Sequence, residues 1–178
     1  MKTATILMSL ILIFGCGTTN YPPLDVVDSV DLNRYTGKWY EIARLPNSFQ
    51  EECYCTTAEY KLNEDNTIDV RNECREDSID GDLDYANGTA YVVEGSNNAK
   101  LKVSFFWPFK GDYWIIELDK DSYSFAVVGT PSRKYLWILS RTPQMDEDLY
   151  KELIARISKK GFDTTKLIVS DSSCFQGG

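Results

Sequence analysis

Histidine is absent from this 178-residue chain. Histidine titrates near neutral pH, acts as the base of Ser-His-Asp and Cys-His nucleophile pairs, and is a common ligand of zinc and haem iron. The sequence therefore excludes hydrolases and metal centres that depend on this side chain. We expect no metal and no cofactor, and a protein that is not an enzyme.

Basic side chains are also in short supply. The chain has 19 Lys and Arg residues against 27 Asp and Glu residues, which gives a formal net charge of −8 at pH 7. Proteins that bind nucleic acid neutralise phosphates with clustered Lys and Arg side chains. This balance predicts that nucleic acid is not a partner.

A long apolar run occurs near the N-terminus, between Ile6 and Phe14, after the single positive charge of Lys2. The run is too short to span a bilayer and predicts an export signal over residues 1–15. Ile13-Phe14-Gly15 directly before Cys16 resembles the lipobox of bacterial lipoproteins, in which the cysteine is acylated. This resemblance implies a lipid anchor on Cys16 at the periplasmic side of the outer membrane; a plain secretory signal is the alternative.

Residues 16–31 are expected to form a lipidated tether. They begin with small and polar residues, include Pro22-Pro23 and have no hydrophobic period. About fourteen extended residues reach roughly 45 Å at some 3.3 Å each. The domain that follows, residues 32–178, could then stand away from the membrane and turn either way.

Four cysteines remain once Cys16 is assigned to the lipid anchor. An even number of cysteines in an exported chain predicts two disulfides, because the compartment is oxidising. A structural zinc site is the alternative, but Cys53 and Cys55 are separated by one residue, whereas close zinc ligands usually have two to four residues between them. We therefore expect disulfides.

The middle of the chain is a succession of short segments rich in aromatic and β-branched residues, with turn residues between them. No helix-forming stretch separates them, so consecutive segments should pair antiparallel, and eight such strands can close into an up-and-down barrel. The fold class is therefore all-β with one helix. The expected strands are 39–44, 56–62, 68–74, 88–94, 100–106, 113–118, 123–129 and 135–141.

One helix is expected from Asp146 to Lys159. Asp146 is a suitable N-cap, Gly161 a suitable stop, and apolar residues recur on one face. That face should pack on the barrel wall. Residues 166–170 could form a short ninth strand.

Gly37-Lys38-Trp39-Tyr40-Glu41 at the start of the first strand resembles the G-x-W signature of the lipocalins. Two further segments, 100–106 and 135–143, match the same family in the same order. With the lipobox, the chain resembles bacterial outer-membrane lipocalins and, more distantly, the apolipoprotein D type. The likeness runs from about Leu32 to Val169.

The resemblance has structural implications at both ends of the barrel. It implies that Arg141 lies over the ring of Trp39 and closes one end, next to Gly37. The apolipoprotein D type implies a Cys55–Cys174 bond, which leaves Cys53 to pair with Cys74. The exchange of Cys53 and Cys55 stays open.

An eight-stranded barrel can hold one small ligand, and strand alternation indicates which side chains face inward. On one strand the alternation does not decide between Tyr113 and Trp114, and a filled core without a cavity is the alternative to a pocket. The other expected lining residues are Ala58, Tyr60, Val70, Ala90, Val103, Phe105, Trp107 and Trp137.

The expected ligand is a fatty acid or a lysophospholipid, stored or transported by a monomer or homodimer. Lys110, Arg133 and Lys134 could attract its head group, although acidic residues between 76 and 84 would repel a carboxylate. The aromatic run at 105–109 could also touch membrane lipid. Two alternatives are an enzyme that uses a cavity cysteine, and a structural or regulatory lipoprotein that binds no lipid.

Overall fold

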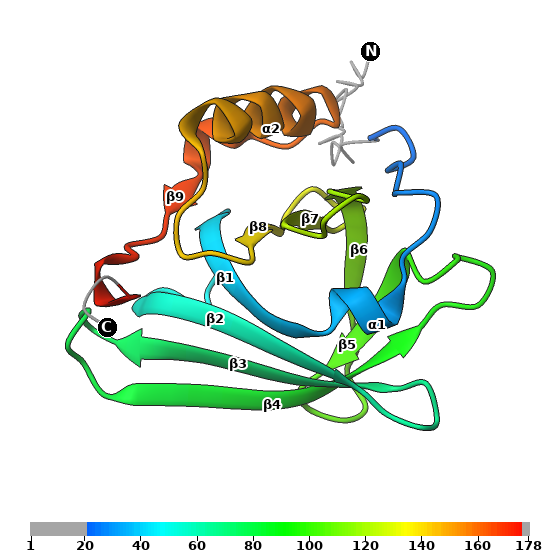
Figure 1. The fold of residues 1–178 in the computed structure, drawn as a ribbon, viewed down its shortest axis with the longest axis horizontal. Coiled ribbons are helices and arrows are strands. Elements are labelled where there is room, and N and C mark those ends of the chain that lie inside the picture. The colour runs from blue at the N-terminus through cyan, green and yellow to red at the C-terminus, as the bar shows by residue number, and fades with distance from the viewer. Residues whose placement is uncertain (1–20, 176–178) are drawn as a thin grey trace, which may run out of the picture.

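The computed structural model describes residues 21–175, which form a β-barrel with a helix on its outer wall (Figure 1). None of the helices in this part of the chain is long and apolar enough to cross a membrane. The eight barrel strands are β1 (Gly37–Arg44), β2 (Cys53–Leu62), β3 (Ile68–Glu76), β4 (Leu83–Val92), β5 (Lys100–Ser104), β6 (Gly111–Leu118), β7 (Phe125–Gly129) and β8 (Leu136–Ser140).

The barrel closes because β1 pairs antiparallel with both β2 and β8. The partners Gly37↔Tyr60 and Tyr40↔Thr57 join β1 to β2, while Tyr40↔Ser140 and Arg44↔Trp137 join β1 to β8. Every other strand pairs with its neighbour in sequence. The predicted eight-stranded antiparallel barrel is confirmed.

The strand ends differ from the sequence expectation in several places, most clearly at the start of β4. Strand β4 begins at Leu83 rather than at residue 88, because Leu83 to Asn87 pair with Arg71 to Arg75 of β3. Turn-forming residues near 82–87 favour a loop there, but pairing with β3 outweighs this local propensity. Strand β5 ends at Ser104, two residues earlier than expected.

Helix α2 (Glu147–Lys159) begins where expected, with Asp146 as its N-cap. Oδ1 of Asp146 accepts hydrogen bonds from the backbone N–H groups of Asp148 at 3.1 Å and Leu149 at 2.9 Å. Leu153 and Ile157 are fully buried against β1, β6, β7 and β8. After the helix, the short strand β9 (Ile168–Val169) pairs with Ala43 and Arg44 of β1.

Two apolar clusters separate the inside of the barrel from the layer beneath α2. The inner cluster lies between the barrel walls, and the outer cluster lies between the strands and α2. Their members alternate along the strands: Val128 is in the inner cluster, whereas Val127 is in the outer one. The alternation is the ordinary consequence of a pleat with both faces covered.

The segment before the barrel packs along it, from the outer cluster at Leu24 to the inner cluster at Val30, which corrects the expectation of a free tether through residue 31. Leu24 and Val30 are buried. The N–H of Val27 donates to the carbonyl of Ile115 at 3.0 Å, and the N–H of Val30 donates to the carbonyl of Asn97 at 3.0 Å. Figure 1 shows this segment running from beside α2 to α1 (Leu32–Tyr35). Apolar residues spaced along residues 24–30 supply the burial that a polar tether would lack.

We call the end of the barrel covered by α1 the floor. There, the guanidinium carbon of Arg141 lies 3.8 Å from the ring centroid of Trp39, as the resemblance implies. Arg141 also donates to the carbonyls of Lys38 at 2.8 Å and Thr36 at 2.9 Å. Gly37 has φ +91°, a left-handed conformation that favours glycine, where the chain turns from α1 into β1.

Replacing Arg141 by alanine should destabilise the barrel by about 2–4 kcal/mol, because the change removes a cation–π contact and leaves several carbonyls without their donor. Urea unfolding measures the effect. Arg156→Ala is the matched control: Arg156 forms exposed ion pairs with Glu152 and Glu117, so its loss should cost less than about 1 kcal/mol. Equal losses in the two variants would contradict a special role for the floor.

Candidate functional site

The end of the barrel opposite the floor carries the connections β1–β2 (45–52), β3–β4 (77–82), β5–β6 (105–110) and β7–β8 (130–135). We call this end the mouth. Alternating strand direction brings these four connections together at one end of the barrel. A ligand that enters the barrel passes between them.

One wall of the barrel interior is lined by small side chains. Ala58 of β2, Asn72 of β3 and Ala86 of β4 lie in one register row, and Tyr60, Val70 and Gly88 lie in the next row toward the floor. A Cβ on Gly88 would come within 2.9 Å of the ring of Phe105, so this ring lies directly on the glycine backbone. Phe105 therefore fills the space over Gly88, and on either side of Gly88 the same face of β4 carries only the small side chains of Ala86 and Ala90.

Three tyrosine hydroxyl groups form a hydrogen-bonded chain within the interior. The hydroxyl of Tyr113 lies 2.8 Å from that of Tyr35 and 2.9 Å from that of Tyr60. Burial raises the pKa of Tyr60 to about 12 and raises those of Tyr35 and Tyr113 well above their usual value. All three phenols are therefore neutral at physiological pH and satisfy one another's polar groups.

Most of the predicted lining residues lie in the interior. Ala58, Tyr60, Val70 and Ala90 are buried in the inner cluster, and Val103, Tyr113 and Trp137 pack against it while partly accessible. Phe105 covers Gly88 and is 38% exposed. Of Tyr113 and Trp114, between which the sequence does not decide, Tyr113 faces inward.

Two predicted lining residues do not face the interior. Trp114 belongs to the outer cluster and has the ammonium of Lys100 4.1 Å from its ring centroid, on the outside of the sheet. Trp107 is 85% exposed and lies in the β5–β6 connection, because β5 ends before it. The prediction for Trp107 was wrong because it continued the alternation of β5 beyond Ser104, where the strand ends.

A buried ion pair in the barrel was not predicted. Nη1 of Arg44 donates to Oε1 of Glu41 at 2.7 Å, and both side chains are almost fully buried. The side chain of Gln50 donates to Oε2 of Glu41 and accepts from Nε1 of Trp137. Alternation from Trp39 places Glu41 on the inside of the barrel. The register irregularity between Glu41 and Ala43 turns Arg44 to the same side as Glu41. The sequence carries no signal for that irregularity.

One of the three predicted head-group residues, Arg133, is committed elsewhere. Arg133 is buried and donates to the carbonyls of Pro22, Pro131 and Lys160. Lys110 lies with its ammonium 3.9 Å from the ring centroid of Tyr91, which is on the outer face of β4. Lys134, on the β7–β8 connection, has its ammonium 5.2 Å from the ring centroid of Tyr135. Lys110 and Lys134 are both exposed, so both remain available at the mouth.

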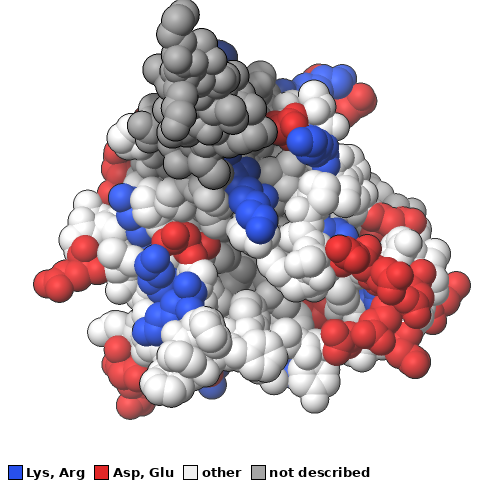
Figure 2. Space-filling model, turned by 180° about the vertical axis from the view of Figure 1, so that it is seen from behind, with Lys and Arg blue, Asp and Glu red and all other residues white. Residues whose placement is uncertain are grey.

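Acidic side chains surround the β1–β2 and β3–β4 side of the mouth. Figure 2 shows them gathered where β3 and β4 meet. Glu52 and Asp77 lie close enough to share a hydrogen bond, which raises the pKa of Glu52. This side of the mouth therefore repels anions.

Two disulfides hold the same region. Cys53 is bonded to Cys74, and Cys55 is bonded to Cys174. The pairing is the one implied by the resemblance, and each bond of this kind typically contributes about 2–4 kcal/mol. The first bond joins β2 to β3 at the mouth, and the second fastens the C-terminal segment to the barrel.

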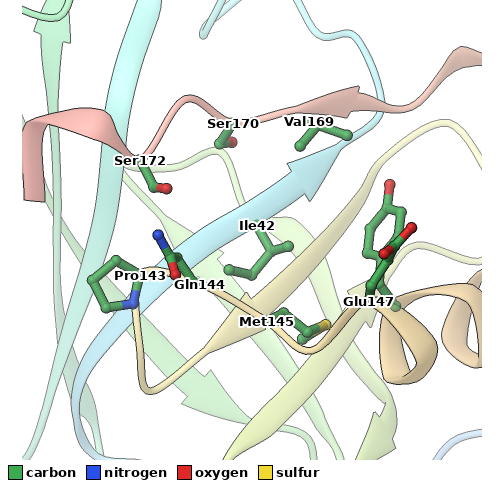
Figure 3. A pocket seen from close by; sticks show the side chains of 9 residues that line it. Ile42, Pro143, Gln144, Met145, Glu147, Val169, Ser170 and Ser172 are labelled. Atoms are coloured by element: carbon green, nitrogen blue, oxygen red, sulfur yellow. The ribbon is translucent and has the colours of Figure 1, made fainter. Parts of the chain in front are cut away.

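A separate groove of about 310 Å³ lies outside the barrel. Figure 3 shows Ile42 of β1 and Val169 of β9 on one side of it, with Met145 and Glu147 at the start of α2 on the other. Three of its lining residues, Ile42, Met145 and Tyr150, belong to or pack against the outer cluster. We do not assign the ligand to this groove.

The Lipocalin-like domain model matches residues 30–172, which include all eight barrel strands and α2. The chain belongs to the lipocalin family. Outer membrane lipoprotein Blc of Vibrio cholerae is 40% identical over 169 residues, covering 94% of this chain and 97% of that protein. Temperature-induced lipocalin-1 of Arabidopsis thaliana is 42% identical over 158 residues, covering 84% and 83%.

Solved structures agree with the lipocalin fold. Insecticyanin from the tobacco hornworm superposes with a TM-score of 0.69 at 22% identity and covers 85% of this chain and 86% of its own. The predicted outer-membrane location of this lipocalin agrees with the name of its Vibrio relative. Signal residues 1–15 and the acylated Cys16 lie outside the described residues.

Replacing Tyr60 by phenylalanine should make the stability of this lipocalin less sensitive to alkaline pH. Below pH 10 the phenol is neutral in both states, and its contribution is complete; between pH 10 and about 12 it ionises in the unfolded chain while it stays neutral in the folded one, so stability falls as pH rises. Urea midpoints at about pH 8 and about pH 11 measure this decline.

The matched control is Tyr85→Phe, which removes a hydroxyl from an exposed side chain. Tyr60→Phe should also cost about 1 kcal/mol at the lower pH through its lost hydrogen bond. The same alkaline decline in Tyr60→Phe and in the unaltered protein would show that the buried phenol does not drive it.

Proposed function

We propose that this lipocalin is a non-enzymatic carrier that holds one long-chain lipid, a fatty acid or a lysophospholipid, in its barrel. In this proposal the protein is tethered to the outer membrane by an acyl group on Cys16. The observation that carries the proposal is the interior wall of small side chains, Ala58, Ala86, Gly88 and Ala90, beside partly accessible apolar residues.

Such a wall suits a hydrocarbon chain energetically. Burying about ten methylenes at roughly 0.8 kcal/mol each supplies about 8 kcal/mol. That value corresponds to roughly micromolar affinity before the costs of association are subtracted. Because the tyrosine hydroxyl groups are paired with one another, a passing hydrocarbon does not strand them without partners.

The charges at the mouth favour a lysophospholipid over a free fatty acid. Lys110 and Lys134 offer exposed cations, whereas Glu52, Asp77 and their acidic neighbours repel a bare carboxylate. A zwitterionic head group can place its phosphate near Lys134 and its cationic end near the acidic side. The polar end of the ligand therefore stays at the mouth while the chain lies inside.

The cysteine chemistry favours a carrier over an enzyme. All four cysteines in the described part of the chain are in disulfides, and a cysteine nucleophile requires a free thiolate. A lipoprotein that binds no lipid is the remaining alternative, and the binding experiment distinguishes it.

Val103→Trp should weaken binding of palmitate and of a palmitoyl lysophosphatidylcholine by at least about tenfold, or about 1.4 kcal/mol. Val103 packs against the inner cluster, so the larger ring would occupy the space of the chain. Native mass spectrometry and displacement of a fluorescent fatty acid measure the affinities. Lys102→Trp is the matched control, because Lys102 pairs with Asp112 on the outer face of the same strand.

Three outcomes are informative. Binding that weakens in Val103→Trp and not in Lys102→Trp supports an interior site. Equal binding by both variants contradicts it. A barrel that retains neither lipid supports the lipoprotein that binds no lipid.

A further inference from the structure

The described chain begins at the mouth end of the barrel. Nη2 of Arg133, on the β7–β8 connection, donates to the carbonyl of Pro22 at 2.7 Å, and its Nε donates to the carbonyl of Lys160 at 3.0 Å. The guanidinium also lies 5.2 Å from the ring centroid of Tyr21. Arg133 thus fastens residues 21–22 next to the end of α2 and beside the mouth.

From this point the chain runs down the outer wall to the floor. Leu24 is buried in the cluster beneath α2, Val27 bonds to β6, and Val30 bonds to the β4–β5 connection at the floor. Figure 1 shows the same course from the end of α2 to α1. Moving the start of this segment to the floor would require breaking all of these contacts.

The length of chain before the fastened residues is short. Tyr21 is five positions after Cys16, and five residue steps span at most about 18 Å when fully extended. The ten residues from Pro22 to Asp31 instead follow the wall toward the floor. A lipid on Cys16 therefore holds the mouth side near the membrane, with far less freedom than a tether through residue 31 would allow.

The mouth also carries large apolar side chains that are strongly exposed to solvent. Phe106, Trp107 and Phe109 of the β5–β6 connection are 80%, 85% and 76% exposed, and Phe49 of the β1–β2 connection is 61% exposed. Exposed apolar groups of this size mark interaction surfaces. Aromatic rings are also the side chains that prefer the interface of a bilayer.

The connections at the floor have the opposite character. They consist largely of polar and charged residues, in the segments 63–67, 95–98 and 119–122. Several of their polar groups are already used in turns, as in the bonds that Asp119 accepts from Ser122 and Ser124. Nothing in these segments matches the apolar surface at the other end.

We propose that the barrel stands on the lipid surface with its mouth against the bilayer and the β5–β6 connection inserted in the interface. This inference rests on the acylation of Cys16 in the proposed function. The acidic side of the mouth opposes insertion of the β3–β4 connection, so the β5–β6 side makes the deeper contact with a zwitterionic surface. A lipid can then pass between bilayer and barrel without crossing water.

Quenching of tryptophan fluorescence by lipids brominated on their acyl chains tests this orientation. The full acylated chain is reconstituted in zwitterionic phosphatidylcholine and phosphatidylethanolamine vesicles. Trp107 should lose most of its emission, and Trp107→Phe should remove that quenching. In the Trp107→Phe background, Glu64→Trp places a matched probe on the exposed β2–β3 turn at the floor, and this probe should stay unquenched.

A second variant tests the role of the short tether. Inserting about twenty Gly and Ser residues between Gly17 and Tyr21 lets the domain move away from the surface and rotate. Quenching of Trp107 should fall substantially in this variant. Unchanged quenching would overturn the inference that the tether sets the orientation.

The remaining outcomes separate this inference from the proposed function. Vesicle flotation and intact mass report acylation independently of fluorescence. A chain that does not float would overturn the anchor and the orientation together. Flotation with an unquenched Trp107, or with a quenched probe at residue 64, would overturn the orientation alone and leave lipid binding intact.

Discussion

The closure of the barrel between β1 and β8 is the interaction on which the rest of the molecule depends. Tyr40↔Ser140 and Arg44↔Trp137 turn an open meander into a ring, and Arg141 lies over Trp39 just beyond that seam. Closure removes the exposed edges of the sheet and creates an inside. Without it, the small residues along β3 and β4 would line only an open surface.

The packed segment before β1 links this closure to the membrane. It covers the outer wall and leads into α1, whose carbonyls accept hydrogen bonds from Arg141. The floor is therefore held by the same stretch of chain whose beginning is fastened at the mouth by Arg133. A buried arginine that seemed suited to a head group instead determines where the chain enters the domain.

The sequence could predict the strands and much of the interior because these follow a period of two. Ala58, Tyr60, Val70 and Ala90 obey that period without interruption. It could not predict features that depend on where a strand ends or shifts: the end of β5 leaves Trp107 outside, and the irregularity in β1 brings Arg44 beside Glu41. The sequence also does not reveal that residues 24–30 pack against the barrel, because their apolar residues follow no helical or strand period.

The polar groups inside the barrel limit how a lipid can lie there. Glu41 and Arg44 neutralise each other, and the three tyrosine hydroxyl groups bond among themselves, so neither set presents an unpaired charge to a ligand head. A charged head group placed deep in the barrel would lose its hydration without gaining comparable bonds. Its stable position is therefore the mouth. With the mouth on the bilayer, that position coincides with the depth of the surrounding lipid head groups, so the ligand keeps its polar end in one environment as it moves between membrane and protein.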